Sequence, residues 1–501
     1  MELAELVRAA NLPAEMRGAV ETPITSLAYD SRAVSEGTLF FCVTGLSRDG
    51  HEFAPAAIEA GAAALVVERP LELGVPEVRV ADARAAMAPL AATFQGDPTA
   101  ELSVVGVTGT NGKTTTAFLT RKLLEAAGRR CGLLGTVQRV VGGQVEEVER
   151  TTPEAIDLQA TFARMLDSGD EACAMEVSSH ALVLHRTDAI HFDVKVFTNL
   201  TQDHLDFHAD MEEYFAAKRL LFSAEGGSPL LVLEGGVSVI NVDDPYGRRL
   251  AEELAHGEGA ECLTFSAAGA DADFSARGVV FDASGSRFAC LTPQGHFNVI
   301  IPLPGQFNVE NAMAALATAD ALGLDLESSV AALASAGRVP GRFEPIEEGQ
   351  SFSVLVDYAH TPDSLENVLK AAREITEGRL IAVFGCGGDR DRDKRPLMGR
   401  AGAEFSDVSV VTSDNPRSEK PDAIIADILG GIPDRDPVVV EADRRQAIAL
   451  ALSRAGTGDT VVIAGKGHEQ GQEFENGRKV PFDDRDVARE ELRALSAGAA
   501  K

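Results

Sequence analysis

The last third of the chain alternates short apolar runs with stretches that place apolar residues at helical spacing. The apolar runs are rich in β-branched residues and lie at 352–360, 379–388, 408–414, 437–443 and 459–467. Stretches with helical spacing, such as 362–375 and 422–431, separate most of them. Regular alternation of strand and helix predicts a parallel, doubly wound sheet of the Rossmann-like kind.

Polar loops directly follow four of these strands. They are the segments 357–363, 385–396, 413–421 and 465–473. The carboxyl ends of parallel strands meet at one edge of a sheet, and ligands bind at that edge in open α/β sheets. We therefore expect the four loops to form one binding edge.

The rest of the chain predicts two further α/β parts. The first hundred residues hold strand patterns at 38–45 and 62–68 and end in the turn-like segment 95–101. The pattern of 102–128 then predicts a strand, a loop of Gly, Thr and Asn, and a helix. A chain of 501 residues is long enough for two to four domains. We predict an α/β protein with three domains: a small N-terminal α/β domain (1–98), a central P-loop ATPase-type parallel sheet (99–338) and a C-terminal Rossmann-like domain (339–501).

Charge and apolar content exclude several classes of protein. The formal net charge is -31, which disfavours nucleic acid and anionic membranes as partners. The chain has no long apolar run and no basic N-terminal segment followed by an apolar one, so we expect a cytoplasmic protein. The 6 cysteines lack CxxC spacing, which favours reduced thiols over disulfides or a zinc site.

The loop 106–116 has the composition of a phosphate-binding loop. Small residues let backbone N–H groups surround phosphate oxygens, Lys113 can reach the terminal phosphates, and Thr114 can hold a magnesium ion. Val107 stands where the common P-loop pattern has its first glycine. A glycine-rich helix cap without a ligand is the alternative. We expect a nucleotide to contact Gly109, Thr110, Asn111, Gly112, Lys113, Thr114 and Thr115.

Two residues downstream are candidate metal ligands. Glu176 ends an apolar run, as a carboxylate at a strand end does, and His204 follows the strand pattern 194–200. Magnesium prefers oxygen ligands, so Glu176 with nucleotide phosphates suits it, and His204 is a less usual ligand. Zinc at His204 and His208 is the alternative, weakened because the HExxH glutamate is missing.

Lys218 lies on the apolar face of a predicted helix. Met211, Tyr214, Phe215, Lys218, Leu221 and Phe222 fall on one stripe at helical spacing. The lysine either extends its amine to the surface along its own apolar stem or is buried. Burial lowers the pKa of an amine and leaves a neutral, reactive group.

Nine motifs occur in order along nearly the whole chain: GTNGKTT, EVSSH, TNLTQDHLDFH, AAKRLLF, GQFNVENAMAAL, PGRFE, DYAHTPDSL, DNPR and GKGHE. With them the chain resembles the Mur ligase family, ATP-dependent enzymes that add amino acids to the peptide of the cell-wall precursor. Within the family it is similar to the type that adds meso-2,6-diaminopimelate or L-lysine to UDP-N-acetylmuramoyl-L-alanyl-D-glutamate in peptidoglycan synthesis.

The resemblance implies roles around ATP and magnesium. Lys113, Lys218 and Arg342 would be catalytic, with Lys218 carbamylated so that a buried amine becomes an anion that helps to hold the metal. Asn308 and Asn311 would face the nucleotide, as would Arg342 at the hinge into the third domain. The magnesium ligands would be Thr114, Glu176, His204 and Lys218.

The resemblance also implies two sets of substrate contacts. The UDP-linked muramoyl dipeptide would contact Ser31, Leu46, Ser47, Arg48, Thr151, Thr152, Ser178 and Arg186. The incoming amino acid would contact Arg390, Asp414, Asn415, Pro416, Arg417, Gly465 and Glu469. Leu184 and Arg150 depart from relatives, which carry glutamine and asparagine there, so we do not carry over those two contacts.

Arg417 is the residue that points to diaminopimelate. Diaminopimelate carries a second carboxylate away from the reacting amine, which a planar guanidinium grips with two parallel hydrogen bonds; lysine presents only an ammonium there. An unpaired or repelled charge rejects the wrong substrate. The resemblance agrees, since DNPR marks the diaminopimelate enzymes of the family. The alternative is a solvated β-turn before a helix.

We therefore expect a monomeric ATP-dependent ligase that uses Mg²⁺ and small-molecule substrates. Two alternatives stay open at this point: a Mur-like ligase acting on another carboxylate, and a P-loop regulator that hydrolyses ATP slowly. Dependence of phosphate release on precursor and amino acid separates an enzyme of this kind from a regulator.

Overall fold

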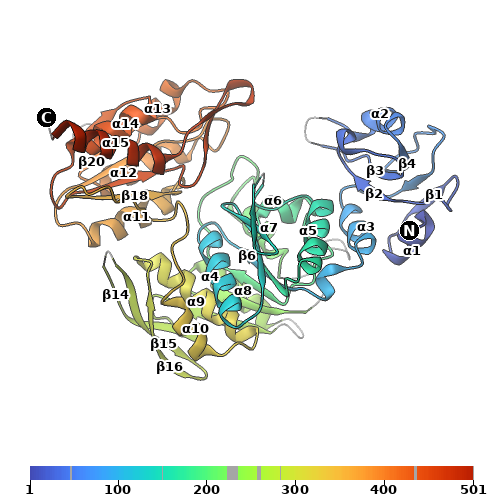
Figure 1. The fold of residues 1–501 in the computed structure, drawn as a ribbon, viewed down its shortest axis with the longest axis horizontal. Helices are drawn as coiled ribbons and strands as arrows, with labels where there is room; N and C mark the ends of the chain where they lie inside the picture. The colour runs from blue at the N-terminus through green and yellow to red at the C-terminus, as the bar shows by residue number, and fades with distance from the viewer. Residues whose placement is uncertain are drawn as a thin grey trace.

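The computed structural model describes residues 1–45, 48–148, 150–222, 235–256, 261–282, 284–433 and 437–499. Three large sheets follow one another along the chain, built from residues 15–79, 103–301 and 344–464, and Figure 1 shows them as three neighbouring α/β bodies. A two-stranded antiparallel sheet, β23 (Gly471–Phe474) with β24 (Arg478–Pro481), follows the third. The expected α/β architecture is confirmed. The proposed boundaries near 98 and 338 fall between these sheets and stay predictions.

The N-terminal sheet has the strand order β1-β5-β4-β3-β2, with β1 antiparallel and the others parallel. Its strands are β1 (Glu15–Arg17), β2 (Ser26–Ala28), β3 (Thr38–Phe41), β4 (Ala62–Val67) and β5 (Glu77–Arg79). The helices α1 (Leu3–Ala9) and α3 (Met87–Phe94) cover one face, and α2 (Ala54–Glu59) lies over the other. Ala155 and Ile156 of the central part complete the core under α3, so the two parts share packing.

The central sheet is mixed, with the order β16-β15-β14-β13-β12-β11-β6-β10-β7-β8-β9. The expected parallel sheet forms its interior: β6 (Ser103–Thr108), β7 (Cys131–Leu134), β10 (Ala172–Glu176), β11 (Val194–Phe197), β12 (Val237–Asn241) and β13 (Cys262–Ser266). β14 (Phe274–Asp282) pairs with β13 in parallel, and antiparallel pairing extends both edges through β8 (Arg139–Val141), β9 (Gln144–Glu146), β15 (Gly285–Thr292) and β16 (Gly295–Ile301). Their short connections explain the difference, because a parallel crossover needs about a dozen residues.

Helices cover both faces of the central sheet. They are α4 (Lys113–Ala126), α5 (Ala155–Asp167), α6 (Ser179–Val183), α7 (Met211–Arg219), α8 (Pro245–Ala255), α9 (Gln306–Ala321) and α10 (Leu326–Leu333). α4 and α9 pack in one core cluster, and α5 and α7 pack in the other. The start of α9 therefore lies beside the phosphate loop that precedes α4.

The C-terminal sheet has the order β17-β18-β22-β19-β20-β21, and all strands from β18 to β21 run parallel. The strands are β17 (Glu344–Pro345), β18 (Ser353–Asp357), β19 (Leu380–Phe384), β20 (Val408–Val411), β21 (Val438–Val440) and β22 (Thr460–Ala464). The helices are α11 (Pro362–Glu374), α12 (Lys394–Phe405), α13 (Pro421–Leu429), α14 (Arg444–Arg454) and α15 (Asp484–Ala499). Separate apolar clusters fill the two faces, which confirms the doubly wound arrangement.

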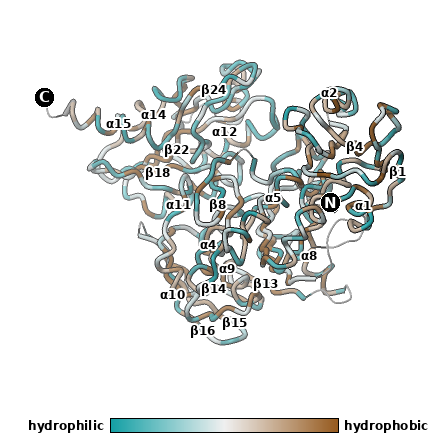
Figure 2. Tube along the Cα trace, turned by 45° about the vertical axis from the view of Figure 1, so that its right-hand side comes forward, coloured by the Kyte–Doolittle hydropathy of each residue, from teal (hydrophilic) through white to brown (hydrophobic). Residues whose placement is uncertain are grey.

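Apolar residues are spread through these cores rather than gathered into one long segment. Figure 2 shows hydrophobic and hydrophilic positions interleaved along the tube. Among the described residues, no helix combines the length and the apolar character needed to cross a membrane. The cysteines Cys42, Cys131, Cys173, Cys262, Cys290 and Cys386 are free thiols, as expected.

Candidate active site

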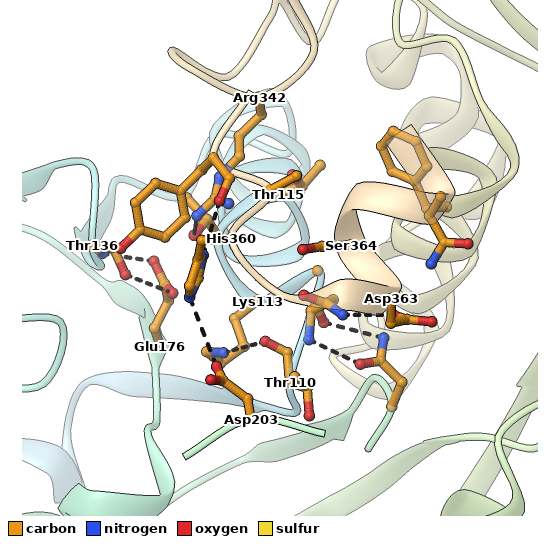
Figure 3. A pocket seen from close by; sticks show the side chains of 18 of the residues that line it. Thr110, Lys113, Thr115, Thr136, Glu176, Asp203, Arg342, His360, Asp363 and Ser364 are labelled. Carbon is orange, nitrogen blue, oxygen red and sulfur yellow. Dashed lines mark hydrogen bonds and ion pairs between the residues drawn. The ribbon is translucent and has the colours of Figure 1, made fainter. Parts of the chain in front are cut away.

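The main pocket lies between the phosphate loop of the central part and the loops that begin the C-terminal sheet. It is lined by residues of 110–115, the ends of β10 and β11, the start of α9, and the segment 357–368. Figure 3 shows Glu176 and Thr136 on one side of this pocket, Asp363 on the opposite side and Ser364 between them. The pocket therefore brings together elements that are distant in sequence.

The loop between β6 and α4 follows the expected strand-loop-helix pattern. Gly109 has φ +146° and Gly112 has φ +86°, conformations that favour glycine. A Cβ at Gly109 would collide with the hydroxyl of Thr198, and one at Gly112 would collide with the side-chain oxygen of Asn311. Both glycines are thus required by local geometry, and α4 presents its free backbone N–H groups to the pocket.

Two lysine amines meet at one carbonyl of this loop. Lys113 Nζ donates to the carbonyl oxygens of Gly109 and Thr110, each at 2.9 Å. Lys218 Nζ donates to the same Gly109 oxygen at 2.8 Å. Burial lowers the pKa of Lys113. This end of the pocket is suited to anionic phosphates because two amines converge there.

Lys218 is buried, as its place on the apolar face of α7 predicts. Its side chain is among the largest that are fully buried, and it lies 4.6 Å from the ring centroid of Tyr214. Burial and the nearby Lys113 hold the pKa of Lys218 well below its usual value. A neutral amine is a nucleophile, so this lysine can add to carbon dioxide.

Arg342 reaches the phosphate loop from the segment that precedes the C-terminal sheet. Its Nη2 donates to Thr114 Oγ1 at 2.8 Å, and its guanidinium stacks over Tyr358 at 4.6 Å. The arginine expected at the hinge therefore lies beside the nucleotide loop. Its placement suits a contact with phosphate oxygens.

Glu176 and His204 both line the pocket and could hold a cation with Thr114. Glu176 is 1% exposed and accepts hydrogen bonds from the backbone N–H of Thr136 at 2.7 Å and from its hydroxyl at 3.1 Å. Burial lowers the pKa of His204 to about 3, which leaves a neutral imidazole. The carboxylate, hydroxyl and imidazole fit magnesium if phosphate oxygens complete the shell.

The structure does not support the zinc alternative. In the part of the chain that the structure describes, no group of three or more His, Cys, Asp or Glu side chains is arranged to hold a metal. His208 is buried and instead shares a hydrogen bond of 3.0 Å with the hydroxyl of Ser179, and it stacks on Tyr214.

Asp203 joins the two halves of the pocket and was missed in the sequence, although it directly precedes His204. Its carboxylate lies 3.7 Å from His360 Nε2 and 3.6 Å from Lys394 Nζ, both of the C-terminal part. Although burial raises its pKa, His204, His360 and Lys394 together hold that pKa well below the usual value. Figure 3 shows His360 pointing to Asp203 across the pocket.

The start of α9 presents one of its two expected asparagines, Asn311, to the pocket. Phe307, Glu310 and Asn311 line the pocket. Asn308 is absent from the described lining; it donates to the Pro304 carbonyl at 2.8 Å and its side-chain oxygen accepts from Asn311 at 3.3 Å. The structure therefore gives Asn308 a supporting place behind Asn311 rather than a place in the pocket.

The residues expected to hold the precursor gather beside Glu176. Thr152 Oγ1 donates to the Glu176 carbonyl at 2.9 Å and accepts from the backbone N–H of Ser178 at 3.2 Å. Arg186 donates to the Thr152 carbonyl at 3.2 Å. Thr151 lines both the main pocket and a second cavity of about 460 Å³ between the first two parts.

That second cavity extends toward the first part of the chain. Tyr29, Asp30 and Arg32 line it together with Arg150. Ser31 lies between two lining residues, Arg48 is exposed, and Leu46 and Ser47 lie outside the described residues. The first part therefore supplies one wall of a path that ends at Thr151.

A buried carboxylate in the same cavity, Glu154, was missed in the sequence. It pairs with Arg84 at 3.2 Å, with Arg150 at 2.8 Å and with Arg186 at 2.9 Å. Arg84 belongs to the first part of the chain, so Glu154 links the first two parts. Arg150, which stands where relatives carry asparagine, therefore pairs with a carboxylate of its own chain, and the sequence did not indicate this pair.

The DNPR loop after β20 is buried, which contradicts the alternative of a solvated turn. Residues 411–416 are all buried, and Arg417 has a side chain that is 22% exposed. Arg417 has φ +49° and donates from Nε to Glu473 at 3.0 Å and from Nη1 to the Gly388 carbonyl at 2.7 Å. Two anchors thus fix the guanidinium beside the loop that follows β19.

The other expected amino-acid residues form a hydrogen-bonded group around Lys466, which the sequence reasoning missed. Lys466 is 0% exposed and donates to Asn415 Oδ1 at 2.9 Å and to Glu469 Oε2 at 2.8 Å. Asn415 Nδ2 also donates to Glu469, at 2.9 Å. Glu469 therefore accepts hydrogen bonds from two donors within the protein, which were not expected from its predicted contact with the amino acid.

The remaining expected residues surround this group. Asp414 and Pro416 are buried, and Asp414 Oδ1 makes no hydrogen bond within the described chain. Gly465 has φ +123° and faces Asp414. Arg390 extends from the loop after β19 toward Asp206 of the central part, 3.7 Å away. The polar loops after β19, β20 and β22 therefore meet at one edge, as predicted.

Comparison with known proteins agrees with this geometry. Three family models match in order: "Mur ligase family, catalytic domain" at 23–95, "Mur ligase middle domain" at 107–319, and "Mur ligase, glutamate ligase domain" at 341–467. The UDP-N-acetylmuramoyl-L-alanyl-D-glutamate--2,6-diaminopimelate ligase of Solibacter usitatus is 46% identical over 98% of both chains. The protein of the same name from Streptomyces coelicolor is 48% identical over 94% of this chain and 92% of that one.

Solved structures share the whole architecture. A diaminopimelate ligase structure matches with a TM-score of 0.69 and 33% identity over 99% of both chains. A MurF ligase of Thermotoga maritima in complex with ADP shows the same fold, with a TM-score of 0.64 and 21% identity over 95% of this chain and 97% of that one. With matches that cover nearly its full length, the chain belongs to the Mur ligase family.

Proposed function

We propose that this protein is an ATP-dependent amide ligase that adds meso-2,6-diaminopimelate to the D-glutamate of UDP-N-acetylmuramoyl-L-alanyl-D-glutamate. The observation that carries the proposal is that loops of the C-terminal sheet meet the phosphate-loop pocket: His360 lies 3.7 Å from Asp203, and His468, next to Glu469, lies 3.2 Å from the Thr136 carbonyl. Thr151 connects the same pocket with the cavity toward the first part. The names of relatives at 46% and 48% identity point to the same reaction. The product is the UDP-linked muramoyl tripeptide used in peptidoglycan synthesis.

The first step activates the precursor. The γ-carboxylate of D-glutamate attacks the γ-phosphorus of ATP in line, a P–O bond forms, and ADP leaves with the electron pair of the broken bond. Lys113 and Arg342 neutralise phosphate charge, and the backbone N–H groups at the start of α4 orient it. Thr114, Glu176, His204 and carbamylated Lys218 would hold magnesium, which neutralises phosphate charge when bound.

The second step forms the amide. The amine of diaminopimelate attacks the acyl phosphate carbon, a tetrahedral intermediate forms, and phosphate leaves with the C–O bonding electrons while the amine loses a proton. Thr151, Thr152, Ser178 and Arg186 hold the precursor, whose uridine end extends toward Ser31, Leu46, Ser47 and Arg48. Arg390, Asp414, Asn415, Pro416, Arg417, Gly465 and Glu469 bind the amino acid.

The proposed reaction also indicates the compartment, the oligomeric state and the partners of the enzyme. All three substrates are small and water-soluble, so the protein works in the cytoplasm as a monomer, without nucleic acid or membrane partners. The strong negative net charge of the chain supports the absence of such partners, because nucleic acid and anionic membrane surfaces repel a negatively charged protein.

A substrate-omission assay tests the proposed function. ADP release is expected only when ATP, magnesium, muramoyl dipeptide and diaminopimelate are all present, and mass spectrometry should detect the tripeptide. Replacing diaminopimelate by L-lysine is expected to lower the rate strongly. ADP release at the same rate without precursor and amino acid would instead indicate a nucleotide-hydrolysing regulator.

A further inference from the structure

Two helices enclose the end of the nucleotide pocket that is farthest from Glu176. Phe307, Glu310 and Asn311 of α9 are spaced by three and four residues, so they share one helix face, and all three line the pocket. On α11, the residues 363, 364, 367 and 368 line the facing wall. An aromatic ring and amide groups therefore bound a slot suited to a flat heterocycle.

Glu310 is the unexplained residue of this slot. Among the described residues, its carboxyl makes no hydrogen bond and no ion pair, and the residue is only partly accessible. The pKa of its carboxyl is raised to about 8 by burial first, and then by the charges of Asp243, Asp363 and Asp244. Its position costs stability, because a desolvated carboxyl faces like charges.

The neighbouring carboxyl groups differ from that of Glu310, because each of them accepts a hydrogen bond from a donor within the protein. Asp363 accepts from the side-chain amide of Asn111 at 2.8 Å. Asp243 accepts from the hydroxyl of Ser266 at 2.6 Å, and Asp244 accepts from the backbone N–H of Leu200 at 3.1 Å. Glu310 is thus the carboxyl of this group that has acceptor capacity left for a ligand.

We infer that Glu310 is a specificity-determining residue that accepts a hydrogen bond from the exocyclic 6-amino group of the adenine base. The inference rests on the proposed function, since it concerns the nucleotide that this ligase consumes. A binding site can hold a group that destabilises the free protein, and such a group is explained when the ligand supplies the hydrogen-bond donor that it lacks. Phe307 offers an aromatic surface on which the base can stack.

The chemistry of purines makes this contact selective. Adenine carries an amino donor at position 6, whereas guanine and hypoxanthine carry an oxygen acceptor at that position. Pairing with the amino group favours the ionised carboxylate of Glu310, which accepts only, so an oxygen at position 6 sets two acceptors against each other unless the carboxyl keeps its proton. A site built to pair with a substrate N–H rejects the analogue that lacks it much more strongly than a merely apolar site does.

The test compares ATP with ITP, whose base has a 6-oxo group and no exocyclic amine, in the complete ligase assay. For wild type we expect a strong preference for ATP in kcat/KM. For Glu310→Ala we expect kcat/KM with ATP to fall at least tenfold through KM, kcat to change little, and the value with ITP to stay the same or rise. Glu327→Ala, which removes an exposed glutamate of α10, should leave both values unchanged.

Thermal unfolding without nucleotide provides the second measurement. Because the substitution removes a carboxyl that faces like charges, the Tm of Glu310→Ala should equal or exceed that of wild type. An equal fall in kcat/KM for ATP and ITP, an unchanged ATP preference, or a lower Tm would overturn the inference. If wild type consumes no nucleoside triphosphate in the complete assay, the proposed function itself fails.

Discussion

Replacing Arg417 by glycine is expected to lower kcat/KM for meso-diaminopimelate by about 10²- to 10⁴-fold and to leave ATP binding unchanged. The guanidinium is expected to form two charge-assisted hydrogen bonds with the distal carboxylate, each contributing about 1.5 to 3 kcal/mol. About 1.4 kcal/mol corresponds to a tenfold change. The measurement is initial-rate kinetics with diaminopimelate and with L-lysine, together with ATP binding by calorimetry.

The surroundings of Arg417 explain why its position is fixed. Glu473 takes Nε and the Gly388 carbonyl takes one hydrogen of Nη1, so Nη2 and the second hydrogen of Nη1 stay available for a carboxylate. Its φ of +49° is also strained for arginine, at a cost of about 1 to 3 kcal/mol. Glycine relieves that strain, so a loss of activity in this variant cannot be ascribed to backbone distortion.

Arg400→Ala is the matched control, because Arg400 is exposed and its distance to Glu404 is 4.0 Å. This variant should keep wild-type kinetics. If Arg417→Gly instead retains the wild-type preference for diaminopimelate over L-lysine, recognition of the second carboxylate lies elsewhere. A parallel loss of ATP binding would show that the C-terminal loops have lost their structure.

Local patterns in the sequence predicted the parts of the fold and site that depend on neighbouring residues. The phosphate loop is continuous in sequence, and the burial of Lys218 follows from its place on one helix face. The meeting of the polar loops in the C-terminal sheet follows from strand direction alone. All three features needed no knowledge of tertiary contacts.

Other features depend on contacts between distant residues. Lys466 pairs with Asn415 across 51 positions, and Arg84 of the first part pairs with Glu154 of the central part; no local pattern indicates such partners. Helical spacing could have identified Glu310, since residues three and four apart share a face and Phe307 begins that face. The antiparallel edges of the central sheet were missed because their short turns were not considered.

The prediction for Lys218 concerns its chemical state. Its neutral amine is expected to add to the carbon of carbon dioxide, forming an N–C bond and releasing one proton, so that a neutral group becomes an anion. The structure favours this change, because two amines otherwise compete for the Gly109 carbonyl. With ¹³C-labelled bicarbonate, we expect a carbamate signal in the ¹³C NMR spectrum of wild type and none in Lys218→Met.

Lys218→Met and Lys218→Arg are both expected to lower kcat by about 10²- to 10³-fold, the effect typical of losing one preorganised charge at a reacting centre. Methionine fills the buried volume, so the Tm should not fall. Arginine keeps a positive charge but cannot be carbamylated. The arginine variant therefore distinguishes a lysine that acts as a cation from one that acts as a carbamate. Added formate should partly restore the methionine variant, whereas near wild-type activity in the arginine variant would show that Lys218 acts as a cation on phosphate.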